Sequence, residues 1–317
     1  MRLAITHETR YRYSPPVQTA QHVAHLQPAN TPCQEVIGHW MQIEPEATVR
    51  HHIDAFFNHR AYWALTHPHD GLMVRAHSEL DTHSLPTANA SQRWEAVREH
   101  FRYRANAPFD PAAEFLFASP YVPRDDAFAA FARPAFKPGL PALAAAQALM
   151  ELIHTDLTYE TASTEVNTPA LEALAQGKGV CQDFAHIMLG CLRSLGLPAR
   201  YVSGYLLTRP APGKVRLIGA DASHAWVSVY VPIVSESDDE TENTGAWFDF
   251  DPTNNRCGWG SPGEDYVTLA TGRDFGDVSP MRGVIQSGAD HTLQVAVTVA
   301  PPDELKALEA QASNAKV

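Results

Sequence analysis

One segment in the second half of the chain most constrains its fold. Apolar side chains recur there at the spacing i, i+3, i+4, i+7, i+8 and i+11, and they are Phe184, Ile187, Met188, Cys191, Leu192 and Leu195. This periodicity predicts a helix with one buried face. A tight, glycine-containing connection at 177–180 precedes the helix, and Gly196 followed by Pro198 predicts its end. Cys181 therefore lies at the start of a central helix, and Cys191 lies on its buried stripe.

Strands are predicted after this helix, because runs rich in valine and aromatic residues follow it at 199–207, 223–231 and 246–251. A polar, acidic segment at 235–243 separates the last two and predicts a solvated loop. An alternating run at 291–299 predicts one more strand. Helices are predicted at 141–154 and after Thr168, whose neighbour Pro169 suits the first helical turn.

The first hundred residues are expected to be β-rich. Short runs at 2–13, 36–43 and 71–80 alternate with turn clusters, which predicts a small antiparallel sandwich or sheet. Seven prolines between 105 and 141 indicate a boundary. We expect four parts: a β-rich region at 1–105, a connector at 106–140, a core at 141–300 and a flexible tail at 301–317.

Composition excludes several classes of protein. Hydrophobic residues make up 44% of the 317 residues and charged residues 19%, which is unlike disordered, collagen-like or coiled-coil chains. The net charge of −12 disfavours a nucleic-acid partner. No run approaches the roughly 18–20 apolar residues of a membrane span. The first ten residues carry charges where a signal peptide needs an apolar run, so we expect a cytoplasmic protein without a membrane partner.

The four cysteines are Cys33, Cys181, Cys191 and Cys257. No two form a C-x-x-C pair, so neither a zinc ribbon nor a thioredoxin-type motif is indicated. Four cysteines in a chain of this length do not predict a disulfide framework. Cys181 is the candidate nucleophile, because the N–H groups and dipole at a helix N-terminus favour a thiolate and can hold an oxyanion. Its position alone leaves open a buried structural cysteine.

His224 and Asp251 are candidate partners for this cysteine. His224 opens a predicted strand, and an imidazole can deprotonate a thiol and later protonate a leaving amine. Asp251 ends the next strand and can hold the imidazole Nδ1–H. Asp249 lies on the same face and competes for this role. A turn-capping role is the alternative for Asp251, which Pro252 follows.

Four motifs resemble the bacterial transglutaminase-like superfamily: GKGVCQDFAH at 177–186, LRSLGLPARYVSGY at 192–205, SHAW at 223–226 and FDPTN at 250–254. The first hundred residues and the segment 272–280 also look like that family. The resemblance implies an α+β, papain-like core, a central helix packed on an antiparallel sheet, with an N-terminal β-rich domain. It implies Cys181 as nucleophile, His224 as base and Asp251 as orienting residue. The acidic segment 235–243 departs from the family pattern and affects expected substrate access.

Other candidates have two interpretations each. Gln182 either supports an oxyanion or faces solvent, and Asp183 is either catalytic or a first-turn carboxylate. Arg273 and Asp274 either reach the site or pair with each other. Three aromatic residues either line a cleft or pack in the core, namely Tyr159, Tyr205 and Trp226.

No metal or organic cofactor is expected. Twelve of the 16 histidines precede residue 101, but their spacing is irregular and no H-E-x-x-H is present. The densest group lies at 67–70, and no loop resembles a calcium-binding EF-hand. We expect acyl transfer on an amide, peptide or isopeptide carbonyl of a protein or peptide substrate, through a thioester. Hydrolysis is slightly favoured over transamidation. The alternative is an inactive binding module.

Overall fold

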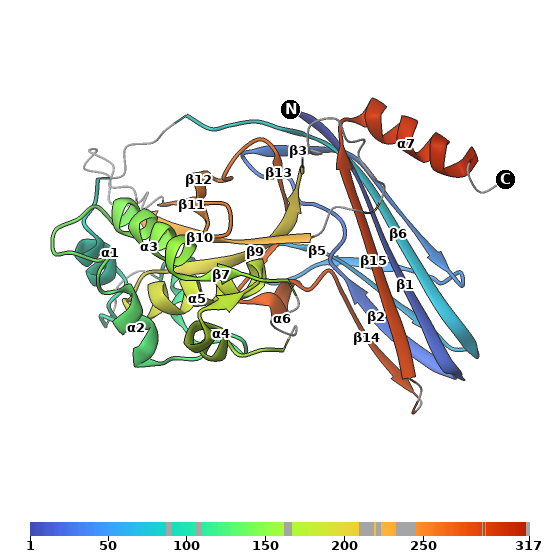
Figure 1. Ribbon diagram of the computed structural model, residues 1–317, viewed down its shortest axis with the longest axis horizontal. Coiled ribbons are helices and arrows are strands. Elements are labelled where there is room, and N and C mark those ends of the chain that lie inside the picture. Colours follow the sequence, from blue (N-terminus) through green and yellow to red (C-terminus); the bar gives the residue numbers. More distant parts are fainter. Residues whose placement is uncertain are drawn as a thin grey trace.

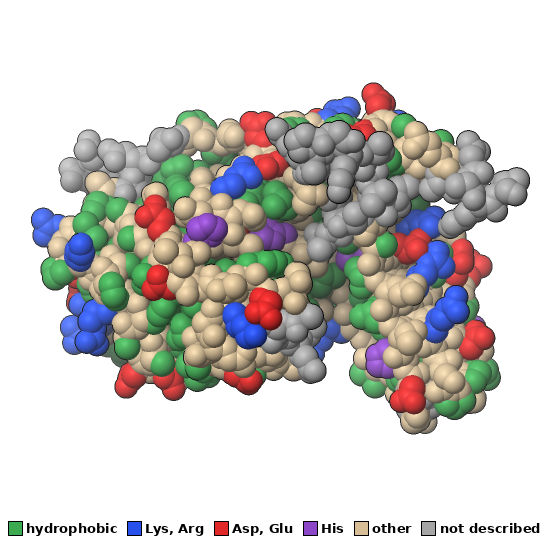
Figure 2. All heavy atoms as spheres, viewed as in Figure 1, with side chains coloured by type: hydrophobic (Ala, Val, Ile, Leu, Met, Phe, Trp, Pro, Cys, Tyr) green, Lys and Arg blue, Asp and Glu red, His purple; other side chains and the backbone are tan. Residues whose placement is uncertain are grey.

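The computed structural model describes residues 1–86, 91–105, 109–161, 167–208, 219, 223–232, 245–286, 288 and 290–314. Figure 1 shows two units side by side, a β-sandwich and a unit of helices packed on a sheet. Figure 2 shows acidic and basic side chains intermingled over the visible face of both units. None of the described helices is both long and apolar enough to span a bilayer.

The β-sandwich consists of two four-stranded antiparallel sheets with the orders β15-β1-β6-β3 and β14-β2-β5-β4. Every second side chain along much of β6 is buried, as expected for a strand with one face on a core. Trp63, Leu65, Leu72 and Val74 pack between the sheets. The strands are β1 (Arg2–Val17), β2 (Thr19–Ala24), β3 (Gln34–Glu44), β4 (Arg50–Ile53), β5 (His59–Leu65), β6 (His69–Thr82), β14 (Met281–Gln286) and β15 (Asp290–Ala300).

The C-terminal strands correct one expected boundary. Residues 141–300 were predicted to form one core, but β14 pairs with β2, and β15 pairs with β1 from Ala4↔Ala300 to Ser14↔Asp290. The physical reason is the apolar face of β15. Its Val297 and Val299 are fully buried in a cluster that also contains residues of β1 and β6. Alternation in the sequence predicts such a strand but not its partner.

Two further expectations are wrong. The predicted flexible tail forms a helix, α7 (Pro302–Asn314), because buried Leu305 packs on Ala4 and Ala300. The predicted connector at 106–140 is part of the main core, where Phe128 and Ala132 are fully buried. Its prolines separate short helices, namely η1 (Pro111–Leu116) and α2 (Asp126–Ala132).

The second unit confirms the predicted central helix on an antiparallel sheet. Strand order is β12-β11-β10-β9-β13, and α5 (Cys181–Ser194) is buried from Asp183 to Arg193. The remaining elements are α1 (Trp94–His100), α3 (Ala142–Asp156), β7 (Thr158–Tyr159), α4 (Ala170–Gln176), β8 (Lys178–Gly179), β9 (Ala199–Leu206), β10 (Ser223–Pro232), β11 (Gly245–Asp251), β12 (Arg256–Trp259), β13 (Tyr266–Gly272) and α6 (Phe275–Val278).

Two buried amide side chains attach the sandwich to the edge strand β13. Asn58 donates to the carbonyl of Thr271 and accepts from its N–H, both at 2.8 Å. Gln34 makes the same pair of bonds with Thr268, at 2.7 and 2.9 Å. Each amide thus satisfies a backbone donor and acceptor at the sheet edge, as a further strand would.

Candidate active site

Cys181 is the first residue of α5, and the local sequence explains why the helix begins there. Gly177 takes the left-handed conformation that ends α4, with φ of 65°. The Asp183 carboxylate, itself buried, accepts a hydrogen bond of 2.8 Å from the Val180 N–H and so stabilises the first turn. A side chain at Gly179 would overlap Asp183, because a Cβ there would lie 2.7 Å from the Asp183 Cβ.

The His224 imidazole lies between Asp251 and Cys181. Its Nε2 is 2.7 Å from Asp251 Oδ2, and Cys181 is close enough to the same ring to raise the pKa of His224. Asp251 was expected on Nδ1, and the structure corrects this. Strand alternation predicts which face a ring occupies, but the side-chain torsions decide which nitrogen meets the carboxylate.

Asp251 is fully buried and accepts hydrogen bonds on both oxygens. Oδ1 accepts from the backbone N–H groups of Thr253 and Asn254, at 2.9 and 3.2 Å. Oδ2 accepts from the Tyr266 hydroxyl and from Asn254 Nδ2, both at 2.7 Å, in addition to His224. The predicted turn-capping role and the predicted contact with histidine therefore coexist in one carboxylate.

The electrostatics favour a charged imidazole. Burial on its own lowers the pKa of His224, but the hydrogen bonds to Asp251 and Cys181 outweigh it and raise the pKa to about 10. Burial acts to raise the pKa of Asp251, and the bond and charge of His224 with the other donors lower it. The arrangement can therefore hold a proton on the ring beside a sulfur atom.

The remaining aromatic candidates separate into two groups. Tyr159 is half-exposed on β7, and its ring lies edge-on to Phe184 of α5, with 6.2 Å between the ring centroids. Trp226 is fully buried beneath His224, where its Nε1 donates to Asp249 at 2.8 Å. Tyr205 is buried at the sandwich, and its hydroxyl meets His7 Nδ1 at 2.9 Å. Tyr205 therefore does not line the site, which corrects that candidate.

Gln182 and Asp183 follow Cys181 in the first turn of α5. Gln182 is partly buried, and Asp183 has the capping role described above. The acidic segment at 235–243, expected near the cleft entrance, lies outside the described residues.

Two residues around Asp251 were missed as site candidates. Asn254 belongs to the FDPTN motif, so its motif membership was a usable signal. Tyr266 has no local signal, because β13 reaches the site only through its pairing with β9.

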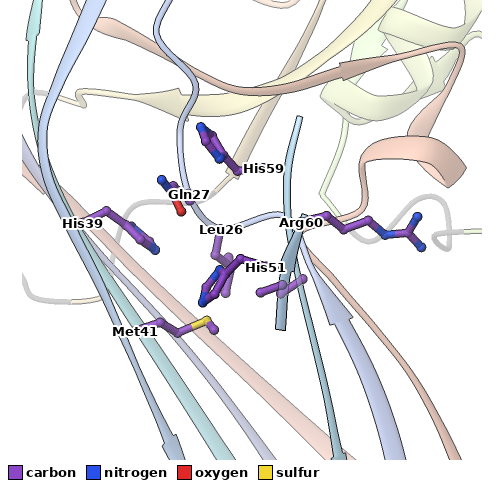
Figure 3. Close-up of a pocket in the computed structure, with 9 residues that line it drawn as sticks. Leu26, Gln27, His39, Met41, His51, His59 and Arg60 are labelled. Carbon is purple, nitrogen blue, oxygen red and sulfur yellow. The ribbon is translucent and has the colours of Figure 1, made fainter. Parts of the chain in front are cut away.

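Histidines do not converge on a metal site in the part of the chain that the structure describes, where no group of three or more His, Cys, Asp or Glu is suitably arranged. In the predicted 67–70 group, His69 Nδ1 contacts the carbonyl of His67 at 2.9 Å. Figure 3 shows His39, His51 and His59 around a sandwich pocket of only about 10 Å³. Burial, with the charges of neighbouring histidines, lowers the pKa of His39 to about 4.

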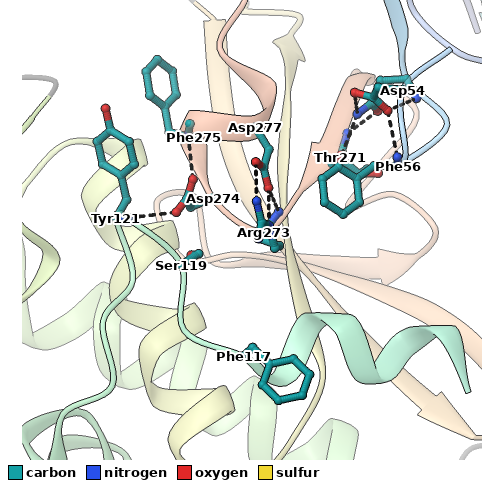
Figure 4. A network of polar contacts seen from close by, with 12 residues as sticks. Asp54, Phe56, Phe117, Ser119, Tyr121, Thr271, Arg273, Asp274, Phe275 and Asp277 are labelled. Carbon is teal, nitrogen blue, oxygen red and sulfur yellow. Dashed lines mark hydrogen bonds and ion pairs between the residues drawn. The ribbon is translucent and has the colours of Figure 1, made fainter. Parts of the chain in front are cut away.

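Arg273 and Asp274 have structural roles (Figure 4). Arg273 pairs with Asp277 at 2.9 Å, not with Asp274. Asp274 is buried, accepts from the N–H groups of Tyr121 and Gly276, and so caps the short helix α6. Neither interpretation offered for this pair, reaching the site or pairing with each other, describes what the two side chains do.

The geometry defines a class of protein. A helix that begins with a cysteine covers an antiparallel sheet. One strand of the sheet brings a histidine near that cysteine, and a neighbouring strand supplies the buried aspartate that bonds to the histidine, as in papain-like α+β cores. The chain belongs to the transglutaminase-like superfamily, which residues 129–252 match. Residues 3–81 match the bacterial transglutaminase-like N-terminal region.

Relatives of similar length extend the likeness to nearly the whole chain. An uncharacterized protein of Mycobacterium tuberculosis is 36% identical, over 95% of this chain and 93% of its own. One of Mycobacterium leprae is 30% identical, over 94% and 98%. Among solved structures, a candidate cysteine protease from Cytophaga hutchinsonii shares the fold, with a TM-score of 0.70 at 20% identity, over 96% of this chain and 91% of that one.

Proposed function

We propose that this protein is a cysteine-dependent enzyme that transfers the acyl group of an amide, peptide or isopeptide bond, with Cys181 as nucleophile. His224 is the acid and base in this proposal, and Asp251 is its positioning residue. The observation that carries the proposal is the His224 imidazole, 2.7 Å from the buried Asp251 and close enough to Cys181, the first residue of α5, for the two side chains to interact electrostatically. Membership of the transglutaminase-like superfamily supports it.

The proposed reaction has two steps. The Cys181 thiolate attacks the carbonyl carbon, and N–H groups at the start of α5 face the oxyanion that forms. The C–N bond then breaks, the amine leaves with the proton of His224, and a thioester remains. In the second step His224 removes a proton from water, which attacks the thioester. The acid is released, and the thiolate and the protonated imidazole are restored.

Hydrolysis is proposed ahead of transamidation, in which an amine would replace water in the second step. The description of the Cytophaga protein as a candidate cysteine protease supports this order. The substrate is proposed to be a protein or peptide. We also propose a cytoplasmic location, which the four free cysteines support because reducing compartments keep thiols unpaired. Cell fractionation with an antibody to the native protein checks the location.

Thiol labelling tests the assignment of the nucleophile. Burial raises the pKa of Cys33 to about 11 and also raises the pKa of Cys191 and Cys257. A chloroacetamide probe at neutral pH is therefore expected to label Cys181 first, as read by peptide mass spectrometry. His224→Gln should slow that labelling at least tenfold. Cys257→Ala is the matched control and should change nothing. Equal labelling of all four thiols contradicts the proposal.

A peptide library separates the two outcomes of the second step. Incubation with and without excess methylamine, followed by mass spectrometry, distinguishes a cleaved or deamidated product from a methylamide. Cys181→Ala should abolish both products while leaving the melting temperature close to that of the native chain. Turnover that survives in Cys181→Ala would rule out the proposed nucleophile.

A further inference from the structure

A cavity of about 450 Å³ lies behind the five-stranded sheet, between the sheet and two loops of the sandwich at 29–32 and 56–58. Arg200, Val202, Trp247 and Asp249 from β9 and β11 line it on the sheet side. Alternation places Asp249 on the sheet face opposite to Phe250, which packs in the core with α5. The volume is within the roughly 300–1,000 Å³ of small-molecule sites, and such sites often lie between two packed units.

Two ionisable side chains that line the cavity have unused hydrogen-bonding capacity. The Nε of Arg200 and the Oδ1 of Asp249 are buried, and neither has a hydrogen-bond partner among the described residues. The two residues lie in one row across the sheet, with Ser228 between them in the strand register. No ion pair joins them in the described chain. The Arg200 guanidinium instead lies over the Trp247 ring, 4.0 Å from its centroid.

Both groups stand to gain from a partner in the cavity. Burial lowers the pKa of Arg200 to about 10, so its guanidinium stays charged near neutral pH. Burial also raises the pKa of Asp249, although Ser228, the charge of Arg200 and the bond from Trp226 counteract this. Buried charges without hydrogen bonds are unfavourable, and a ligand that supplies those bonds recovers this cost.

The walls of the cavity are held in place. Asn58 and Gln34, which bond to Thr271 and Thr268 of β13, lie in the sandwich segments that border it. Figure 4 shows the Asp54–Phe56 loop beside Thr271. Cys33 Sγ also donates to the Trp259 carbonyl at 3.2 Å. The cavity is therefore preformed between two units that are fixed to each other.

Phe57 marks the mouth of the cavity. Its side chain is 81% exposed although it is large and apolar, and its backbone is in the left-handed region with φ of 65°. A bulky residue rarely adopts this conformation, and such strain is concentrated at functional sites. An exposed aromatic side chain at the rim offers an apolar surface to an entering ligand.

We propose that this cavity binds a free α-amino acid with a large apolar side chain. The α-carboxylate would accept hydrogen bonds from Arg200, the α-ammonium would donate to Asp249, and the side chain would pack against Val202 and Trp247. A simple anion would bring negative charge next to Asp249, and a simple cation would bring positive charge next to Arg200. A neutral apolar molecule would leave both groups unpaired. The site is separate from Cys181, so binding can be measured without turnover.

Isothermal titration with L-phenylalanine and L-leucine tests the proposal on the full-length protein. We expect one molecule bound per chain. N-acetyl-L-phenylalanine amide, which lacks both charges, should bind at least tenfold more weakly. Arg200→Met and Asp249→Asn should each weaken L-phenylalanine binding tenfold or more, whereas Arg133→Met, at an exposed position, is the control and should not.

A measurement on the unmodified chain covers the case in which a variant fails to fold. Hydrogen exchange with and without L-phenylalanine should show slower exchange at 56–58 and 200–202 and no change in β3. Absence of binding by both free amino acids overturns the proposal. Equal binding of the blocked analogue also overturns it, as does protection elsewhere with none at the cavity.

Discussion

At the scale of single residues, Asp251 organises the candidate active site. One oxygen is held by two backbone N–H groups and the other by His224, Asn254 and Tyr266. A carboxylate with this many donors stays ionised and fixed in position, which in turn orients the imidazole. Tyr266 comes from β13 and Asn254 from the turn after β11, so the orientation of His224 depends on residues that no local motif connects.

Tyr266→Phe removes one donor to Asp251 without changing the size of the side chain. A hydrogen bond to a charged group contributes about 1.5–3 kcal/mol, so we expect kcat/KM to fall roughly tenfold or more. The pH–rate profile should also move, since Asp251 helps to set the pKa of His224. Steady-state kinetics at several pH values measures both. Tyr62→Phe, in the sandwich, is the control. A variant with native rate and profile would show that Tyr266 only fills space.

The pKa of His224 makes a prediction about stability. Its pKa rises from 6.5 in the unfolded chain to about 10 in the folded protein. The resulting stabilisation is therefore complete below pH 6.5 and disappears as the pH rises through 10. The lowered pKa of Asp251 adds stability above 3.8 that is lost in acid. Urea unfolding of the native chain and His224→Gln should differ most near pH 6 and least near pH 10. A difference in unfolding free energy that does not change with pH would contradict the proposed interaction between His224 and Asp251.

At the scale of elements, the N-terminus of α5 carries the cysteine, and Asp183 defines that terminus. Asp183→Ala removes the acceptor of the Val180 N–H, so we expect a loss of about 1–2 kcal/mol of stability. Activity should fall further, because Cys181 lies in the same turn. Asp125→Ala is the matched control. It removes the N-cap carboxylate of α2, which accepts a hydrogen bond of 2.8 Å from the Ala127 N–H, and should destabilise the protein without a specific loss of turnover. Equal activity losses would contradict this role.

Helix and strand periodicity was enough to predict the positions of Cys181, His224 and Asp251, because each lies at the end of an element with a strong pattern. Features that depend on pairing between distant segments could not be predicted. Tyr266 reaches Asp251 through the β13–β9 pairing. The interpretation of 301–317 as a tail failed because the helix there depends on contacts with β1, and a short polar helix has little signal of its own.

At the scale of the whole molecule, the two units are interlocked in sequence and in space. The chain builds most of the sandwich, then the helical unit, and returns to complete the sandwich with β14 and β15. Residues of the sandwich also reach β13, the strand that carries Tyr266. The site and the cavity behind it therefore depend on the sandwich, although Cys181, His224 and Asp251 all belong to the second unit.

Asn58→Ala tests this dependence. The substitution leaves the Thr271 N–H and carbonyl without their partner in a partly buried setting, so we expect a loss of about 2–4 kcal/mol of unfolding free energy. Urea denaturation followed by tryptophan fluorescence measures it. Asn30→Ala is the matched control. The exposed Asn30 side chain accepts a hydrogen bond from the Val36 N–H of β3, inside the sandwich, so its loss should cost less than about 1 kcal/mol. If both variants behave alike, the amide contacts to β13 do not hold the units together, and the sandwich is attached through its apolar cluster with β9 and β13 instead.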